Sequence, residues 1–460
     1  MQILRLLIRD RGLRPEARHY KWLIQCNSDP ERGSSDVLRG LLTEMEEHGI
    51  PLDSSMLHAV LQAVAVHPDH MLRQDVLRAL RDRWLPLSPD GWHYVVAGLI
   101  REHQFELALD HIAHMQMKDI FVKDWLHSLL IYYLCEFREF EHVLQLTRSR
   151  LNQGHRLTRR LCTEVLTAAI KAGHHETVSF IWWRMVNLEY MKLPPDLLTR
   201  TLQVAAPRGD TQLATSIMQY MYNNLEMRKR LDQRHYRHWY RAYLKNGDVY
   251  SAFQVVCQMH KAGHGAYDRI ADDLSIACLK GKISAKELWR MLQQLKSKGH
   301  DVPLTCAKVA IELCTKCPPV YGEPEVDTGI ELYKELHTIC SERPGIRFFN
   351  SLLRMCRAES PAQGSADVSM RLQRTMFVLK EMEAANASPD MPTYRHLIQL
   401  CLSTGKYKTA YLYYQNLLER GLRPSKRLCR GIRFFCARSS NEYAVKLLHE
   451  LEALGSKHST

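Results

Sequence analysis

One stretch of this 460-residue chain combines basic and aromatic side chains in a pattern suited to a polyanion. In MRKRLDQRHYRHWYRAY, Arg234, Arg237 and Arg241 recur at i, i+3 and i+7, which places them on one face of a helix. Because arginines neutralise phosphates and aromatic rings stack on bases, the stretch predicts contact with nucleic acid. The alternative is a solvated charged face. Trp239 and Tyr240 fall at core positions, and we expect them to be buried against the next helices.

A second basic face closes the chain. Lys426, Arg430 and Arg433 have a similar helical spacing, with Arg427 beside them. The whole chain has a net charge of +13 and a pI of about 9.1. A basic excess of this size favours an anionic partner, either nucleic acid or an acidic membrane surface. No run of about 18 apolar residues is present, so the sequence predicts no membrane span.

Cysteine and histidine offer a third candidate chemistry. Cys314, Cys317, His337 and Cys340 give the spacing C-x2-C-x19-H-x2-C, a ligand set that zinc accepts. We favour buried thiols instead, because cysteine recurs near the ends of equivalent helices, where it would pack as a small apolar residue. These cysteines are Cys26, Cys135, Cys314, Cys356 and Cys401. The 13 cysteines are irregularly spaced, which predicts reduced thiols rather than a disulfide framework.

Motifs of known catalytic sites are missing from the sequence. There is no glycine-rich phosphate loop, no HExxH zinc motif and no HxE with a downstream PCxxC of the zinc deaminases. His235 and His238 lie three residues apart without an acidic or third ligand, so a basic surface pair is the favoured interpretation. We therefore expect no enzymatic activity, no metal and no other cofactor.

The elements that position these residues belong to a repeat. The string RGLRP occurs at Arg11–Pro15 and again at Arg420–Pro424. It is typical of a helix exit, because glycine supplies a left-handed cap and proline prevents the helix from continuing. The segment from Met391 to Ser425 contains two helical patterns, separated by Gly405 and closed by the second copy.

The unit recurs through the chain with a period of about 35 residues. Second-helix methionines keep this phase, with Leu80 where one is skipped: Met45, Met115, Met185, Met221 and Met259. Glycines between the two helices do so as well: Gly173, Gly209, Gly247 and Gly281. Two stretches resemble insertions, Pro318–Gly329 and Glu359–Met370. Self-similarity at this period predicts an all-α, right-handed solenoid of about twelve helix-turn-helix repeats.

The repeat pattern also predicts boundaries. Residues 1–15 resemble the close of a second helix, so we expect the chain to begin within a repeat and an N-terminal portion to be missing. An organelle-targeting presequence is the alternative for these arginine-rich residues, but Asp10 and the in-phase exit favour a repeat. Repeats one to nine would occupy 16–320, degenerate repeats with insertions 321–388, and the C-terminal repeats 389–460.

The unit MPTYRHLIQLCLSTGKYKTAYLYYQNLLERGLRPS resembles a pentatricopeptide repeat. The residues that carry the resemblance are Tyr394, Leu397, Ile398, Gly405, Ala410, Gly421, Leu422 and Pro424. The rival is the tetratricopeptide repeat, whose second helix carries a small residue where this chain has methionine. The resemblance implies a solenoid that binds single-stranded RNA in an organelle. It also implies that first helices line a concave groove and that two side chains per repeat read one base.

In this family the two reading residues are the fifth of the first helix and the last of the repeat. The resemblance pairs Arg395 with Ser425, His93 with Lys123, and Arg237 with Tyr267 or a neighbour. Ser128, Thr163 and Thr199 suit the fifth position, but the last positions depart from the usual Asp or Asn, so we expect no base-by-base decoding. Arginine and histidine there favour phosphate contact or stacking. The full predicted RNA-binding set is Lys21, His93, Lys123, Ser128, Thr163, Thr199, Arg234, Arg237, Arg241, Arg395, Ser425, Lys426, Arg430 and Arg433.

The resemblance implies a mitochondrial matrix protein, of fungal or animal type, that binds single-stranded RNA, and the basic residues favour a basic groove as the binding surface. Its role would be transcript stabilisation or processing, rRNA maturation or translation activation. The alternative is a protein-binding scaffold, such as a mitoribosome component or a respiratory-complex assembly factor. The positions of four arginines distinguish the two functions. Arginines that line one continuous groove would favour RNA binding, and arginines scattered outside an apolar groove would favour the scaffold. The four arginines concerned are Arg234, Arg237, Arg395 and Arg430.

Overall fold

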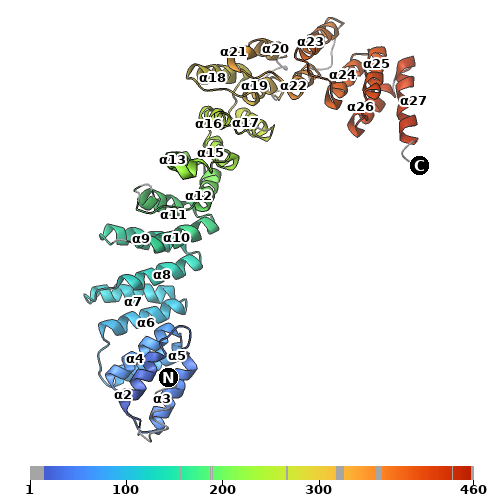
Figure 1. Cartoon of the computed structure of the whole chain (residues 1–460). Coiled ribbons are helices and arrows are strands. Elements are labelled where there is room, and N and C mark those ends of the chain that lie inside the picture. Colours follow the sequence, from blue (N-terminus) through green and yellow to red (C-terminus); the bar gives the residue numbers. More distant parts are fainter. Residues whose placement is uncertain are drawn as a thin grey trace. The chain divides into compact units, whose positions relative to one another are not determined.

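The fold is built from helices alone across the residues that the computed structural model describes. These residues are 15–155, 157–186, 188, 190–265, 268–316, 326–357, 365–437 and 439–456. They form 26 α-helices and one π-helix, and no strand (Figure 1). The all-α solenoid of helical hairpins predicted from the repeat is therefore confirmed.

The helices pair in chain order into twelve hairpins, each with a first and a second helix. The first helices are α2 (Ala17–Cys26), α4 (Ser54–Val66), α6 (Pro89–Arg101), α8 (Asp124–Glu136), α10 (Arg159–Ala172), α12 (Pro195–Arg208), α15 (Gln233–Asn246), α17 (Asp268–Lys280), α19 (Leu304–Lys316), α22 (Ile346–Arg357), α24 (Met391–Ser403) and α26 (Lys426–Cys436). In each hairpin the first helix is followed by its partner after a short connection or, in the three hairpins that begin with α2, α19 and α22, after a longer one.

The second helices have similar lengths, except that two are irregular and the one at Ser365–Ala384 is longer. They are α3 (Ser35–Glu47), α5 (His70–Asp82), α7 (Phe105–Met117), α9 (Phe140–Asn152), α11 (His175–Ile181) continued by the π-helix η1 (Trp182–Val186), α13 (Thr211–Asn223), α16 (Val249–Lys261), α18 (Ala285–Ser297), α20 (Val326–Lys334) with α21 (Leu336–Ile339), α23 (Ser365–Ala384), α25 (Tyr407–Glu419) and α27 (Glu442–Ser456). A single extra turn, α14 (Leu225–Arg228), precedes α15.

The chain divides into two compact units, Met1–Val204 and Ala205–Thr460, and the boundary falls within α12. Within each unit, the first helix of one hairpin packs against the first helix of the next, as α4 does on α6 and α22 does on α24. The first helices of a unit therefore form one layer. Their second helices pack against them from the other side, because neither helix of a hairpin can bury its apolar face alone.

Helix starts and exits follow local chemistry. First helices begin at capping residues: the side chains of Asp53, Ser88 and Ser425 accept hydrogen bonds from backbone N–H groups of the first turn. The exit at Gly421 is left-handed with φ 71°, as predicted for RGLRP. The first copy of the string lies outside the described residues except for Pro15. Elsewhere the left-handed exit is carried by non-glycine residues such as Trp84, with φ 56°.

The repeat core matches the prediction closely. All five in-phase methionines and Leu80 are buried. Gly173, Gly209 and Gly247 are left-handed, as expected between the helices of a hairpin. Gly281 also lies between its two helices, α17 and α18, as predicted, but the left-handed residue at that exit is its neighbour Lys282, with φ 54°.

Two further expectations need correction. Cys135, Cys314, Cys356 and Cys401 are buried as predicted, but Cys26 is exposed. The predicted insertions are partly helical, since Val326 to Gly329 begins α20 and Ser365 to Met370 begins α23. Their other residues lie outside the described ones, as do residues 1–14 of the predicted N-terminal tail.

Membrane insertion has no candidate helix. Across the described parts of the chain, no helix combines the length and the apolar character that a membrane span requires.

Candidate functional site

The fifth residue of a first helix repeatedly touches the residue that precedes the next first helix. The Nε2 atom of His58 accepts a hydrogen bond from the backbone N–H of Ser88 at 3.0 Å. His93 and Lys123 repeat this contact at 3.0 Å in the next hairpin. The two positions that the resemblance singled out are thus neighbours in space, although about thirty residues of chain separate them.

The predicted pair His93 and Lys123 is engaged within the protein. His93 is 1% exposed, and its Nδ1 lies 2.6 Å from the carbonyl oxygen of Pro89. The Lys123 ammonium forms a 2.5 Å ion pair with Asp90, and that carboxylate raises the pKa of Lys123. Because both ring nitrogens of His93 face the backbone, the structure gives this side chain a connecting role between hairpins.

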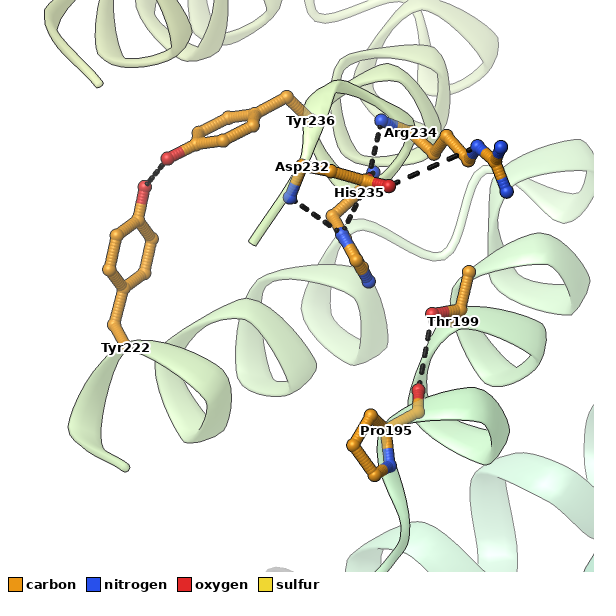
Figure 2. Close-up of polar contacts among 7 residues, drawn as sticks. All are labelled: Pro195, Thr199, Tyr222, Asp232, Arg234, His235 and Tyr236. Atoms are coloured by element: carbon orange, nitrogen blue, oxygen red, sulfur yellow. Dashed lines mark hydrogen bonds and ion pairs between the residues drawn. The ribbon is translucent and has the colours of Figure 1, made fainter. Parts of the chain in front are cut away.

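The predicted hydroxyl side chains are bonded to their own helices. Ser128, Thr163 and Thr199 each lie at the fifth position, and each donates to the carbonyl oxygen four residues earlier, at 2.9, 2.9 and 3.1 Å. Figure 2 shows this for Thr199 and Pro195. A hydroxyl that donates in this way retains its lone pairs, so those of Ser128 and Thr163 can still accept a hydrogen bond from a ligand.

Lys21 occupies the fifth position of α2 and is half-buried. It lies near Asp53, the residue that caps α4. The pKa of Asp53 is lowered mainly by the hydrogen bond from the Met56 backbone, with smaller contributions from Ser55 and the Lys21 charge. This places a fifth residue beside a last residue once more.

The basic face of α15 is present, and part of its charge is neutralised. Arg234 is exposed, and its Nε lies 3.9 Å from Asp232, the capping residue of α15 (Figure 2). Arg241 forms a 3.0 Å ion pair with Asp273 of α17. Arg237 is half-buried between them along the helix. Its predicted partner Tyr267 lies outside the described residues.

Most of the aromatic and histidine residues of α15 lie in the core. Trp239 and Tyr240 are 7% and 1% exposed, so the predicted burial is confirmed. His235 is also buried, and its Nδ1 accepts from the Asp232 backbone N–H at 3.1 Å. Burial, and then the charges of Arg237 and Arg241, lower the pKa of His238. The predicted surface pair is therefore wrong for His235, which completes the cap of α15.

A basic cavity of about 640 Å³ lies beside α15 and was not predicted. Its lining includes Arg228, Lys229 and Lys261, together with Tyr222 and Tyr236. The two tyrosine hydroxyls are 2.5 Å apart (Figure 2). The charged side chains are exposed at its mouth, so the cavity extends the basic character of this hairpin.

The C-terminal hairpins carry the remaining predicted residues. Lys426, Arg430 and Arg433 are exposed on α26, and Arg395 is half-buried on α24. The Ser425 hydroxyl accepts from the Leu428 backbone N–H at 3.3 Å and so caps α26. These residues share the layer of first helices, as predicted.

One contact in these hairpins was missed from the sequence. Asn350 is the fifth residue of α22 and donates from Nδ2 to Oδ1 of Asp390, the cap of α24, at 3.0 Å. Both residue types are those usual for base reading in the resembled family. The pair escaped notice because 40 residues separate its members instead of about thirty. The predicted insertion between the helices of this hairpin lengthens the repeat, so the regular spacing of these two positions is lost.

Arginines that the sequence did not connect gather beside this pair. They are Arg354 and Arg357 of α22, Arg395 of α24 and Arg427 of α26, and we call them the arginine cluster. Burial lowers the pKa of Arg357 and of Arg395, and the charges of Arg427 and Arg354 lower both further. Burial, and then the charges of Arg357, Arg395 and Arg354, lower the pKa of His396 to about 3. The cluster is therefore a region of concentrated positive potential.

The two basic regions of the C-terminal unit are separated by acidic side chains. Asp273 of α17 pairs with Arg241, and Glu312 of α19 lies 2.9 Å from the Arg354 Nη2 atom. The predicted arginines thus lie on first helices, yet they form one region on α15 and another on α22 to α26. The arrangement matches neither of the two extremes expected for RNA binding and for a scaffold.

The zinc alternative gains no support. Cys314 and Cys340 are both buried, and burial raises the pKa of the Cys340 thiol to about 12. Cys317 lies outside the described residues. Within the described residues, no group of three or more potential ligands is placed to hold a metal ion.

Comparisons with known proteins identify repeats in the chain. A family model described as "Pentatricopeptide repeat-containing protein" matches residues 196–334, and one described as "Pentatricopeptide repeat domain" matches residues 377–426. A third, described as PET122, matches residues 121–246. No curated protein sequence matches the chain.

Solved structures give similar but distant matches. The crystal structure of the pentatricopeptide repeat protein PPR10 from maize is 15% identical, with 99% of this chain and 76% of that chain covered and a TM-score of 0.33. The structure of yeast Rmd9p in complex with a 16-nt target RNA is 10% identical. It covers 86% of this chain and 77% of that chain, with a TM-score of 0.36.

Proposed function

Because this chain is a pentatricopeptide repeat protein, matched by repeat models at residues 196–334 and 377–426, we propose that it binds single-stranded RNA. The proposed role is mitochondrial gene expression: transcript stabilisation or processing, rRNA maturation or translation activation. The proposed location is the mitochondrial matrix, and this part rests on the resemblance to organellar proteins alone.

The observation that carries the proposal is the Asn350–Asp390 contact beside the arginine cluster. An amide offers a donor and an acceptor to a base edge, and guanidinium groups bind phosphates. Single-stranded RNA presents both chemistries at once, with unpaired base edges and a phosphate at every nucleotide. The half-buried hydroxyl of Thr163 adds an acceptor at the equivalent position of an earlier hairpin.

The mechanism that fits this arrangement is passive. A strand held along the layer of first helices is shielded from nucleases and from pairing with other RNA. This requires no catalytic group, so we propose a non-enzymatic role.

Binding to a mixed pool of single-stranded RNA, with duplex RNA as the control and across a salt titration, tests the proposal. We expect single-strand preference and an affinity that falls steeply with salt, because phosphate contacts release counterions. Sequencing the retained RNA then identifies the target. Equal binding of duplex and single strand at low salt would contradict the proposal.

A protein-binding scaffold is the second candidate, and exposed apolar side chains in the N-terminal unit favour it. Trp84 is 93% exposed, Met117 77% and Phe121 68%, and all three lie at or after the ends of second helices. Large exposed apolar side chains of this kind mark protein interfaces when they gather. Crosslinking in isolated mitochondria, with and without ribonuclease, separates a mitoribosome or assembly partner from RNA-mediated association.

A further inference from the structure

Three consecutive first helices meet at one side chain, Gln399 of α24. The Nη1 atom of Arg357, on α22, donates a hydrogen bond to the Gln399 Oε1 atom. On α26, Gly431 approaches so closely that a Cβ atom there would lie 2.6 Å from Gln399 Nε2. Arg395 lies one turn before Gln399 and Arg427 one turn before Gly431, so this close packing also brings those guanidinium groups together.

Within the part of the chain that the structure describes, the positive charges gathered here exceed the negative charges beside them. Glu312 lies 2.9 Å from the Arg354 Nη2 atom, as an ion pair without hydrogen-bond geometry. The Asp390 carboxylate acts on Arg395, but its Oδ1 already accepts bonds from Asn350 and from the Thr393 backbone. Among the described residues, the Glu312 and Asp390 carboxylates thus face the four guanidinium groups of the arginine cluster.

An excess of guanidinium groups costs stability in the free protein. Arginine remains protonated in proteins, so the cluster cannot relieve repulsion by losing a proton. The lowered pKa of Arg357 and of Arg395, from burial and then from their arginine neighbours, reflects this cost. Such an arrangement persists when a ligand of opposite charge repays it in the bound state.

We propose that the arginine cluster binds a phosphate group of the RNA strand whose base lies against the Asn350–Asp390 pair. The inference rests on the proposed function and assigns to it a specific anion site. Guanidinium groups match phosphate with parallel N–H···O bonds, and three helices present them from different directions. Asn350 and Arg354 lie one turn apart on α22, so a base and its adjacent phosphate span the distance between the pair and the cluster.

The experiment compares Arg395→Gln and Arg427→Gln with the control Arg420→Gln, which changes an exposed arginine at the end of α25. The urea midpoint of the free protein and the affinity for a selected single-stranded RNA are measured for each. We expect both cluster variants to raise the urea midpoint and to weaken RNA binding about tenfold. The slope of affinity against salt falls by about one phosphate contact.

A merely structural role gives the opposite pattern. Arg395→Gln would then lower the urea midpoint and leave RNA affinity equal to that of the Arg420→Gln control. That result would overturn the proposal while leaving RNA binding by the chain intact.

Inorganic pyrophosphate separates the anion site from RNA binding as such. We expect pyrophosphate to raise the melting temperature of the unmodified protein and to lose this effect in Arg395→Gln. If pyrophosphate has this effect but the protein binds no RNA, the cluster is an anion site for free phosphate. That outcome would reject both the RNA phosphate as its ligand and the proposed function. RNA binding unaffected by either cluster variant would reject the cluster alone.

Discussion

The Nδ2 atom of Asn350 donates a 3.0 Å hydrogen bond to Oδ1 of Asp390, linking the fifth residue of α22 to the cap of α24. The same Oδ1 accepts from the Thr393 backbone N–H at 3.0 Å. The Thr393 hydroxyl lies 2.8 Å from Asn350 Oδ1, within reach to donate. Neighbours thus hold the Asn350 amide in place, and one of its two N–H groups remains for a ligand.

Replacing Asn350 by alanine removes this presented donor. We expect affinity for selected single-stranded RNA to fall about fivefold, which corresponds to about 1 kcal/mol, the usual net contribution of one hydrogen bond. Base selectivity at one position of the selected RNA should relax at the same time. Fluorescence anisotropy with RNAs substituted at single positions measures both effects.

The Asp390→Ala variant tests whether Asp390, which binds Asn350, also takes part in RNA binding. It needs a control, because it also removes the cap of α24. Asp248 caps α16, a second helix, by accepting from the Ser251 backbone N–H at 3.0 Å. Each alanine variant should lower the free energy of unfolding by about 1 kcal/mol. Only Asp390→Ala should weaken RNA binding, and equal RNA affinities of the two variants would contradict the assigned role.

Asp273→Asn removes a negative charge that neutralises Arg241. The Asp273 Oδ2 atom accepts from Arg241 Nη2 and from the Tyr240 hydroxyl, both at 3.0 Å. With this carboxylate gone, we expect about threefold tighter RNA binding and a steeper dependence on salt. The free energy of unfolding should fall by about 1 kcal/mol.

Asp75→Asn is the matched control for this change of charge. Asp75 is an exposed carboxylate on the second helix α5, away from the layer of first helices. A nitrocellulose-filter titration at several salt concentrations compares the two variants. If Asp75→Asn tightens RNA binding as much as Asp273→Asn, the effect is one of overall charge and the α15 region has no special part.

Gly40→Ala and Gly431→Ala should have different effects on stability. A Cβ atom at Gly40, within α3, meets nothing within 4 Å, so alanine should raise the free energy of unfolding by about 0.5–1 kcal/mol. At Gly431 the new methyl group displaces the Gln399 amide and disturbs its bond from Arg357. Urea unfolding should show little or no gain there, and an equal gain at both positions would refute the close approach of α26.

Acidification should destabilise the C-terminal unit through His396. Burial, and then the charges of Arg357 and Arg395, lower the pKa of this ring from 6.5 to about 3. The folded protein keeps the ring neutral, whereas the unfolded chain binds a proton once the pH falls below 6.5. Stability from this group is therefore complete above pH 6.5 and is lost as the pH falls, by about 1.4 kcal/mol per pH unit at full slope.

Urea unfolding at pH 7, 6 and 5 tests this slope, with His396→Gln as the variant. The variant should lose part of the pH dependence, while His127 of the N-terminal unit, whose pKa burial lowers to about 4, still contributes its own. Carboxylates with lowered pKa, such as Asp69, do not affect this pH range, because the stability that they provide is lost only as the pH falls to about their usual pKa of 3.8 and below. An unchanged slope in His396→Gln would contradict the buried neutral ring.

The repeat predicted most of the fold because burial recurs with the hairpin. Met45 and Met259 keep their phase since each fills the same space between a second helix and its neighbours. Gly281 keeps the predicted place between α17 and α18, although the left-handed residue at that exit comes one position later, at Lys282. Burial of Cys26 was wrongly predicted: it is the last residue of α2, where the helix ends, and it is exposed.

The site was less predictable because it depends on contacts between helices. The sequence suggested that His93 faces a ligand, but the backbone of Lys123 occupies its ring nitrogen. Asn350 and Asp390 lost their regular spacing to an insertion that leaves the stacking of first helices intact. The arginine cluster draws on three helices, and no spacing in the sequence shows which arginines packing brings together.

His58 and His93 also determine how the N-terminal unit comes apart. Each repeat of a solenoid touches only its neighbours, so the bonds at each joint decide whether repeats open singly or together. These two rings bind the amide hydrogens of Ser88 and Lys123, at the joints of α4 with α6 and of α6 with α8. Those hydrogens exchange with solvent when neighbouring repeats separate, so their exchange rates report how often each of the two joints opens.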